Sequence, residues 1–175
     1  MKIALCLSGY FSNSKGIEDG LSGHHYINRK LLSKHDVDVF VHSWDLENKE
    51  KVLSLYKPKD SLFEQQKDFK SELDVGNEEY FYGQHGSYYH NSMYKSFSVS
   101  YSRKMSVLLK KNYEDKNNFK YDCVVMCRFD LGQRGKQYPQ KHYATNFNFS
   151  ENLDMNFVYS VYWDHVTHGC ADHWF

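Results

Sequence analysis

The chain of 175 residues lacks several features that mark common functional classes. It has no excess of one charge, because 22 Lys and Arg residues balance 22 Asp and Glu residues. Proteins that mainly bind nucleic acid or anionic membranes usually carry a basic excess, so neither partner is expected. No apolar run approaches the roughly 18 residues that a transmembrane helix needs. With only two prolines, the composition favours a compact domain over a disordered chain.

The chain also lacks a recognisable disulfide or zinc framework. It has four cysteines but no Cys-x-x-Cys pair, and Cys6, Cys123 and Cys127 lie within short apolar runs. We expect buried free thiols, which are typical of a reducing compartment, so the cytoplasm is the predicted location. The apolar run at the N-terminus is too short to predict a signal peptide.

Short apolar runs alternate with helical patterns along the chain. Buried strands are predicted at Ile3–Leu7 and Cys123–Cys127, with further candidates at Ser61–Phe63 and Phe157–Trp163. Another strand is predicted at Val37–Val41, where Asp38 interrupts the apolar run and favours a place nearer an edge of the sheet or a contact with a neighbouring loop. Helices are expected over 17–34, Lys49–Tyr56 and Ser92–Glu114, whereas residues 64–90 show no clean period. This alternation predicts an α/β sandwich with a mostly parallel central sheet, formed by residues 1–175 as a single domain.

The expected helix over Ser92–Glu114 has a stripe of apolar residues. They recur every four residues and are Met93, Phe97, Tyr101, Met105, Leu109 and Tyr113. A stripe of this kind usually faces a core rather than a cofactor, so we assign it to the hydrophobic core.

Polar residues follow three of the predicted strands. They are Ser8 and Gly9 after the first strand, residues 42–45 after the second, and Arg128 to Asp130 after the strand at Cys123–Cys127. In a parallel sheet these ends meet at one edge, where α/β proteins bind their ligands. An arginine suits a phosphate and a carboxylate suits a hard cation, although Arg128 and Asp130 could instead form a structural ion pair. Gly9 is not part of a G-x-G-x-x-G pattern, so a dinucleotide site is not favoured.

A second polar cluster lies near the C-terminus. His165, His168 and Asp172 have a spacing that would suit a metal on a helix, but Gly169 favours a loop. The chain ends in the apolar residues Trp174 and Phe175, where domains usually end in looser residues. We therefore expect a C-terminally truncated domain with an apolar patch there, through which it could form homo-oligomers.

Three segments resemble a known family. Residues 2–9, 36–44 and 121–131 look like small glycosyltransferase-like proteins of bacteria and phages, which are similar to the GT-A nucleotide-sugar transferases. The resemblance implies a Rossmann-like GT-A fold. In that fold an Asp-x-Asp motif after a central strand holds a divalent metal on the donor diphosphate. Here the matching triplet is Arg128-Phe129-Asp130, so the first aspartate is replaced by arginine.

The resemblance assigns expected roles to five residues. Ser8 and Gly9 would shape the nucleotide pocket, Asp130 would bind Mg or Mn, and Arg128 would neutralise the departing diphosphate. Asp172 matches a later acidic segment and would deprotonate the acceptor hydroxyl. The expected function is transfer of a sugar from a nucleotide-diphosphate donor to a carbohydrate or other hydroxyl acceptor. Two alternatives remain open: a non-catalytic nucleotide- or sugar-binding module, and a metal-dependent hydrolase built on His165, His168 and Asp172.

Overall fold

The computed structural model describes most of the N-terminal two thirds of the chain and a little of the remainder. The described residues are 1–13, 16–69, 93–130, 149–150, 152–154, 156–157 and 159. The predicted sites at His165, His168 and Asp172, and the predicted apolar patch at Trp174 and Phe175, lie outside these residues.

The described strands form one parallel sheet. Its order is β3-β2-β1-β4, where β1 is Lys2–Gly9, β2 is Asp36–Ser43, β3 is Asp60–Phe63 and β4 is Cys123–Arg128. Each neighbouring pair runs parallel. The predicted α/β class and the four strands are thereby confirmed, and the arrangement is Rossmann-like.

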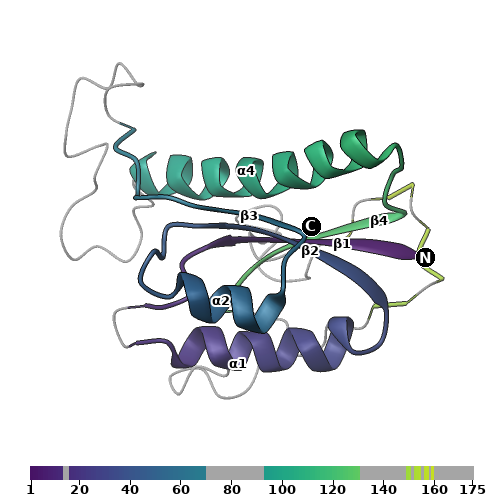
Figure 1. Cartoon of the computed structure of the whole chain (residues 1–175), viewed down its shortest axis with the longest axis horizontal. Coiled ribbons are helices and arrows are strands. Elements are labelled where there is room, and N and C mark those ends of the chain that lie inside the picture. Colours follow the sequence, from purple (N-terminus) through teal and green to yellow (C-terminus); the bar gives the residue numbers. More distant parts are fainter. Residues whose placement is uncertain are drawn as a thin grey trace, which may run out of the picture.

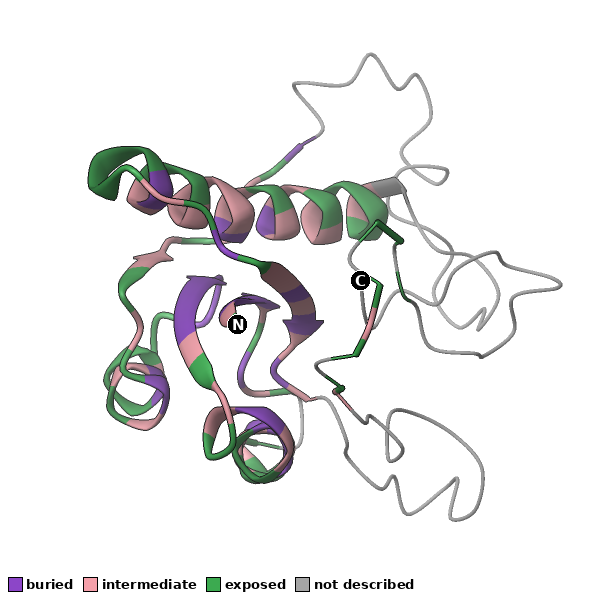
Figure 2. Cartoon of the chain, turned by 90° about the vertical axis from the view of Figure 1, so that its right-hand side faces the viewer, coloured by how far each residue is buried: buried purple, intermediate pink, exposed green. Residues whose placement is uncertain are grey.

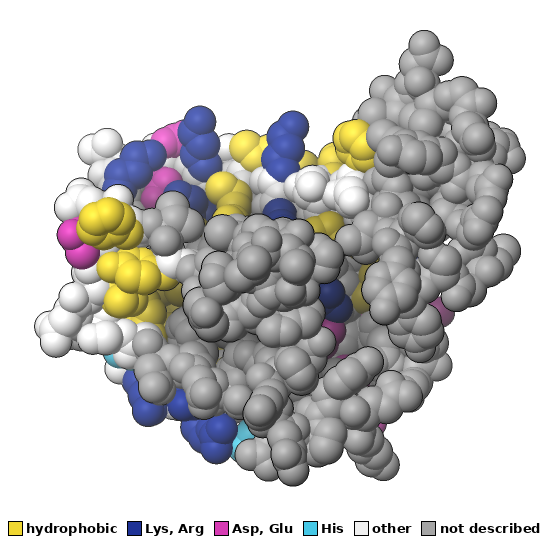
Figure 3. Space-filling model, turned by 180° about the vertical axis from the view of Figure 1, so that it is seen from behind, with side chains coloured by type: hydrophobic (Ala, Val, Ile, Leu, Met, Phe, Trp, Pro, Cys, Tyr) yellow, Lys and Arg dark blue, Asp and Glu magenta, His cyan; other side chains and the backbone are white. Residues whose placement is uncertain are grey.

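Helices cover both faces of the sheet. Helix α1 (Glu18–Ile27) continues into the π-helical turn η1 (Asn28–Leu32) and shares one face with α2 (Lys49–Tyr56), while α4 (Met93–Asn117) covers the other face (Figure 1). Buried residues concentrate in the sheet and on the helix sides that face it (Figure 2). Lysine and arginine side chains gather over α4, away from the sheet (Figure 3).

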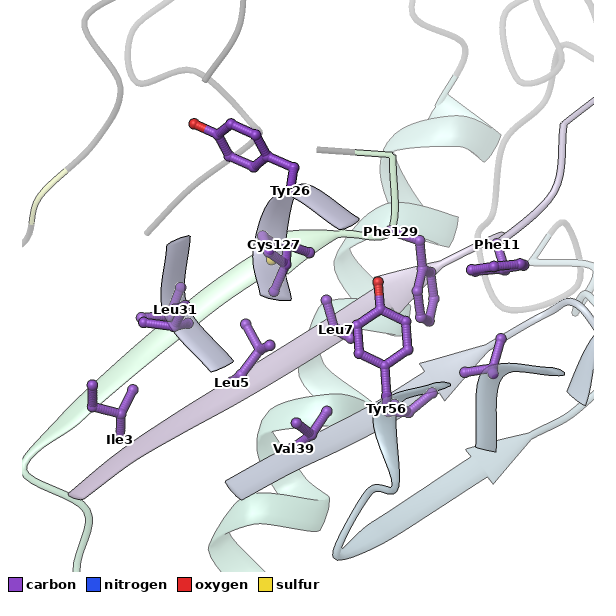
Figure 4. Close-up of a cluster of buried hydrophobic side chains, with 14 residues drawn as sticks. Ile3, Leu5, Leu7, Phe11, Tyr26, Leu31, Val39, Tyr56, Cys127 and Phe129 are labelled. Atoms are coloured by element: carbon purple, nitrogen blue, oxygen red, sulfur yellow. The ribbon is translucent and has the colours of Figure 1, made fainter. Parts of the chain in front are cut away.

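Alternation along β1 divides the core into two layers. Ile3, Leu5 and Leu7 point toward α1 and α2, where they pack with residues such as Val52 and Phe129 (Figure 4). Ala4 and Cys6 point toward α4 in a second cluster with Phe40 and Tyr121. Because both faces of the strand are covered, a continuous apolar run is what this position requires.

The apolar stripe of α4 is only partly confirmed. Leu109 and Tyr113 pack against the sheet cluster, but Phe97 is 37% exposed. A repeat of four residues advances about 40° further than a full turn at each step, because a helix turns every 3.6 residues. From Phe97 to Tyr113 the stripe therefore rotates by about 160° and cannot keep to one face. Among the positions of α4 whose burial is described, Ser102 and Ser106 are buried most deeply, both 1% exposed.

The strand predicted at Phe157–Trp163 is wrong where the structure describes it. Phe157 lies in a bend and Tyr159 has no regular structure, while residue 158 and residues 160–163 lie outside the described part. Asp154 explains the bend, because its carboxylate accepts the Asn156 N–H at 3.0 Å and its carbonyl accepts the Phe157 N–H at 3.1 Å. Such an aspartate-initiated turn competes with an extended chain.

Two further properties follow from the described residues. Cys6 and Cys127 are buried free thiols, and Cys123 is partly buried and also free. Within the described ranges, none of the helices combines the length and the apolar character that crossing a membrane would require.

Candidate functional site

The carboxyl ends of β1, β2 and β4 meet at one edge of the sheet. The strand register pairs Ser8 with both His42 and Arg128, and Gly9 with Ser43. Because these strands are parallel, the residues that follow them lie along the same edge. The strand ends at Gly9, His42 and Asp130 therefore share one edge as predicted, whereas the expectation that they line one cleft there stays a prediction.

This edge contains the topological switch point of the sheet. From β1 the chain adds β2 and β3 on one side and then returns to place β4 on the other side of β1. The switch therefore lies between β1 and β4, and α/β sheets bind ligands at such a position. Gly9 ends β1 and Arg128 ends β4, so the two strand ends that flank the switch are two of the predicted site positions.

Gly9 forms a turn that only glycine adopts readily. Its φ is +98°, a conformation that side chains disfavour, and within the described part of the chain no heavy atom lies within 4 Å of where a Cβ would stand. Its backbone is held on both sides by serines: the Gly9 N–H donates to Ser102 Oγ at 2.9 Å, and Ser43 Oγ donates to the Gly9 carbonyl at 2.8 Å. The turn is thus fixed from within the protein, while the position of the absent side chain is open.

Ser102 belongs to a buried hydrogen-bonded chain. His42 is fully buried, with Nδ1 2.7 Å from Ser102 Oγ and Nε2 3.0 Å from Glu64 Oε1. Burial lowers the pKa of His42, although the hydrogen bond to Glu64 acts in the opposite direction. A neutral imidazole follows, with its proton on Nε2, because a carboxylate can only accept.

Glu64 follows β3 and completes this chain. Burial would raise the pKa of Glu64, but the hydrogen bond from His42, the contact with Tyr101 and the charge of Lys67 together lower it. The Glu64 carboxylate lies 3.8 Å from Lys67 Nζ and is one quarter exposed. Glu64 therefore remains ionised and fixes the orientation of the buried imidazole.

Asp45 ties the loop after β1 to the loop after β2. Its carboxylate accepts the N–H and O–H of Ser12 at 2.8 and 2.7 Å, and it also accepts hydrogen bonds from Asn48. Burial would raise the pKa of Asp45, but the hydrogen bonds from Ser12 and Asn48 lower it. This carboxylate is therefore committed to holding the loops together.

Arg128 and Asp130 bind each other. Arg128 Nε donates to Asp130 Oδ1 at 3.0 Å and Nη2 donates to Oδ2 at 2.7 Å, and the two side chains are 41% and 33% exposed. Strand β4 ends at Arg128 and the next two residues turn, so the pair forms across the turn rather than along an extended strand. An ion pair this accessible contributes little stability and is open to exchange with another anion.

Helix α1 approaches the switch point closely through two glycines. A Cβ on Gly20 would lie 2.2 Å from the carbonyl oxygen of Phe11, and one on Gly23 would lie 1.7 Å from that of Phe129. The helix therefore packs directly on the turns after β1 and β4. Sequence reasoning overlooked this pair, although two glycines three apart in a predicted helix are a recognisable signal of close approach.

Sequence reasoning also missed Ser102 and Glu64. Ser98, Ser102 and Ser106 follow each other at intervals of four, and a serine row beside an apolar stripe is the available signal for Ser102. Glu64 had no signal, because it lies in a charged segment without a period.

The described residues contain no group of three His, Cys, Asp or Glu side chains that could hold a metal ion. The predicted base Asp172 lies outside the described residues, as do His165 and His168. Comparisons of the chain with protein-family models, with curated proteins and with solved structures gave no match.

Proposed function

We propose that the chain is a GT-A-like glycosyltransferase domain that binds a nucleotide-diphosphate sugar between the ends of β1 and β4. The observation that carries this proposal is the coincidence of the switch point with the Gly9 turn on one side and Arg128 on the other. A glycine turn allows a ligand to approach the backbone closely, and an arginine fork binds phosphate oxygens in pairs.

Arg128 is the residue proposed to bind the diphosphate. Its guanidinium already holds two carboxylate oxygens of Asp130, and two phosphate oxygens have a similar spacing. The donor diphosphate would take the place of Asp130 as its partner. During transfer the acceptor oxygen bonds to the anomeric carbon, the bond from that carbon to the phosphate oxygen breaks, and the diphosphate keeps the electron pair. Arg128 would stabilise the charge that develops there.

Tyr10 offers a surface for the base. It directly follows the Gly9 turn and is 49% exposed. An exposed aromatic ring beside a turn that binds phosphate can stack on any of the nucleobases, because each has a flat aromatic face.

The described residues do not fit the divalent metal that the family resemblance implies. Asp130 is the predicted ligand, and a guanidinium nitrogen of Arg128 lies 2.7 Å from its carboxylate, where a cation would be repelled. We therefore derive no step through a metal. The predicted role of Asp172 as the base that receives the acceptor proton remains a prediction.

The second candidate is a binding module without catalysis. The ion pair between Arg128 and Asp130 favours it, because the pair occupies the place of the metal-binding motif in the transferases that the chain resembles. Such a module would bind the nucleotide through Arg128 and release it unchanged.

Calorimetry with UDP and GDP, with and without Mn, tests the site. We expect one of these nucleotides to bind, and Arg128→Gln to weaken binding about tenfold or more, which corresponds to about 1.4 kcal/mol. If Asp130 only competes for Arg128, Asp130→Asn strengthens binding without Mn. If Asp130 holds a cation as predicted from the sequence, Asp130→Asn instead weakens the Mn-dependent part at least tenfold, about 1.4 kcal/mol.

A matched control is Asp115→Asn. Asp115 is an exposed ion-paired aspartate near the end of α4, 3.3 Å from Lys120, and its loss should leave nucleotide binding unchanged. The absence of binding to both nucleotides, or equal binding by wild type and Arg128→Gln, would refute the proposal. Binding without sugar transfer to any hydroxyl acceptor would favour the binding module.

A further inference from the structure

Four segments distant in sequence meet at a chain of hydrogen bonds. Glu64 follows β3, His42 lies in β2 and Ser102 lies in α4, and the chain ends at the Gly9 N–H of β1. His42 is fully buried and Ser102 is 1% exposed, whereas the Glu64 side chain is 25% exposed. These hydrogen bonds thus connect a partly solvated carboxylate with the backbone turn at the switch point.

The donors and acceptors of this chain have one consistent assignment. Glu64 can only accept, so the neutral imidazole of His42 carries its proton on Nε2 and accepts at Nδ1. Ser102 then donates its hydroxyl proton to Nδ1 and accepts the Gly9 N–H with its oxygen. Each link fixes the orientation of the next, so Glu64 indirectly sets the direction of the Gly9 amide.

The composition Ser, His and Glu resembles the nucleophile group of serine hydrolases, but the geometry excludes that role. A nucleophile must reach a substrate, and Ser102 is 1% exposed on the side of α4 that faces the sheet. Its oxygen also accepts the Gly9 N–H at 2.9 Å. The group therefore acts on the protein's own backbone.

The hydrogen bonds end at the Gly9 N–H, and this position gives them more than a structural role. Gly9 has both backbone groups held by side chains and a φ of +98°, and no described residue has an atom within 4 Å of where its Cβ would stand. Sites that bind ligands precisely need a second layer of residues that locks the first. His42 lies in such a second layer, because it is buried behind the Gly9 turn and hydrogen-bonded at both ring nitrogens.

We propose that His42 is a positioning residue that sets the Gly9 turn through Ser102, with Glu64 holding the imidazole in the required tautomer. The inference rests on the proposed function, because the turn is positioned for the diphosphate of a nucleotide sugar. His42 itself touches no substrate. Its effect on binding is transmitted through Ser102 to the backbone of Gly9.

The test compares two buried serines on the same helix face. Ser102→Ala removes the acceptor of the Gly9 N–H, whereas Ser106→Ala is the matched control, because Ser106 is also 1% exposed but its hydroxyl, among the described residues, donates to the Arg103 carbonyl of its own helix. We expect Ser102→Ala to move the ¹H–¹⁵N resonance of Gly9 and to weaken UDP or GDP binding by about fivefold or more. The Ser106→Ala variant should do neither, and circular dichroism confirms that both variants fold.

Two variants of His42 add a rescue experiment. Asparagine keeps an acceptor near the position of Nδ1, so His42→Asn should retain more nucleotide affinity and a more native Gly9 resonance than His42→Gln, which keeps only a donor toward Glu64. Equal behaviour of the two variants would show that the acceptor toward Ser102 has no effect on the turn, which overturns the positioning role.

The outcomes separate this inference from the proposed function. An unmoved Gly9 resonance in Ser102→Ala overturns the inference whether or not a nucleotide binds. A moved resonance with nucleotide affinity equal to that of Ser106→Ala also overturns it, while the proposed function stands. A moved resonance in a protein that binds neither UDP nor GDP refutes the proposed function, and the link from His42 to the turn is kept.

Discussion

Substitution of Gly23 by alanine should destabilise the protein even though alanine is the better helix former. Gly23 lies in α1, and a Cβ there would meet the Phe129 carbonyl oxygen at 1.7 Å, the Phe129 carbonyl carbon at 2.8 Å and the Asp130 Cα at 3.2 Å. These are backbone atoms, which cannot rotate away as a side chain would. The helix and the turn after β4 must therefore move apart.

The size of the effect follows from two opposing terms. Carbon and oxygen atoms approach no closer than about 3.3 Å, so the helix and turn must separate by about 1.6 Å. Overpacking in a well-packed region costs about 1–3 kcal/mol, and a rigid backbone neighbour places this site near the upper value. Alanine recovers about 1 kcal/mol of helix propensity relative to glycine. The net loss is about 2 kcal/mol, or about 4–8 °C in melting temperature for a domain of this size.

Urea unfolding followed by circular dichroism measures this difference. The control is Ser22→Ala, on the neighbouring exposed position of α1, which should change stability by no more than about 0.5 kcal/mol. If Gly23→Ala equalled or exceeded the wild type in stability, the close approach of α1 to the turn that bears Asp130 would be refuted.

Three further predictions concern buried polar groups and a buried thiol of the sheet and α4. The Tyr121 hydroxyl donates to the buried Asp38 carboxylate at 2.7 Å, so Tyr121→Phe should lower the free energy of unfolding in urea by about 1 kcal/mol, and unchanged stability would contradict the contact. Burial would raise the pKa of Glu114, but hydrogen bonds from the Tyr121 N–H and Lys110 lower it below 4.5. This carboxylate stabilises the fold above that pH and the contribution is lost as pH falls through the lowered value, so Glu114→Gln should flatten the decline of stability as pH falls below 4.5. Burial raises the pKa of the Cys6 thiol to about 12, so native protein at pH 8 should leave Cys6 unlabelled by iodoacetamide in peptide mass spectrometry, and rapid labelling would show that β1 opens locally.

The strands were predictable because burial on both faces leaves a strong pattern. Ile3–Leu7 and Cys123–Cys127 are continuous apolar runs that pair with each other in the sheet, and both contribute side chains to the clusters on its two faces. Parallel pairing then places the residues after each strand at a common edge. The grouping of Gly9, His42 and Arg128 was therefore accessible from sequence without any knowledge of the strand order.

The partners of these residues were less accessible, because they depend on side-chain geometry across elements. An apolar period of four identified α4 but misplaced its buried face at Phe97, since the true period is 3.6. The face that meets His42 is instead marked by the small residue Ser102, which lets α4 lie close to the sheet. Glu64 reaches His42 from a segment that has no pattern at all.

The pair of Arg128 and Asp130 shows the limit of reading chemistry from spacing. Two residues apart on an extended strand, they would point in one direction and could serve one ligand together. The turn after β4 instead brings them into direct contact, so each is the first partner of the other. A nucleotide that binds there must therefore outcompete a carboxylate already held by the same arginine. Because both side chains remain accessible, breaking their ion pair costs little free energy. If Asp130→Asn strengthens nucleotide binding in the absence of metal, Arg128 is the residue that binds the diphosphate.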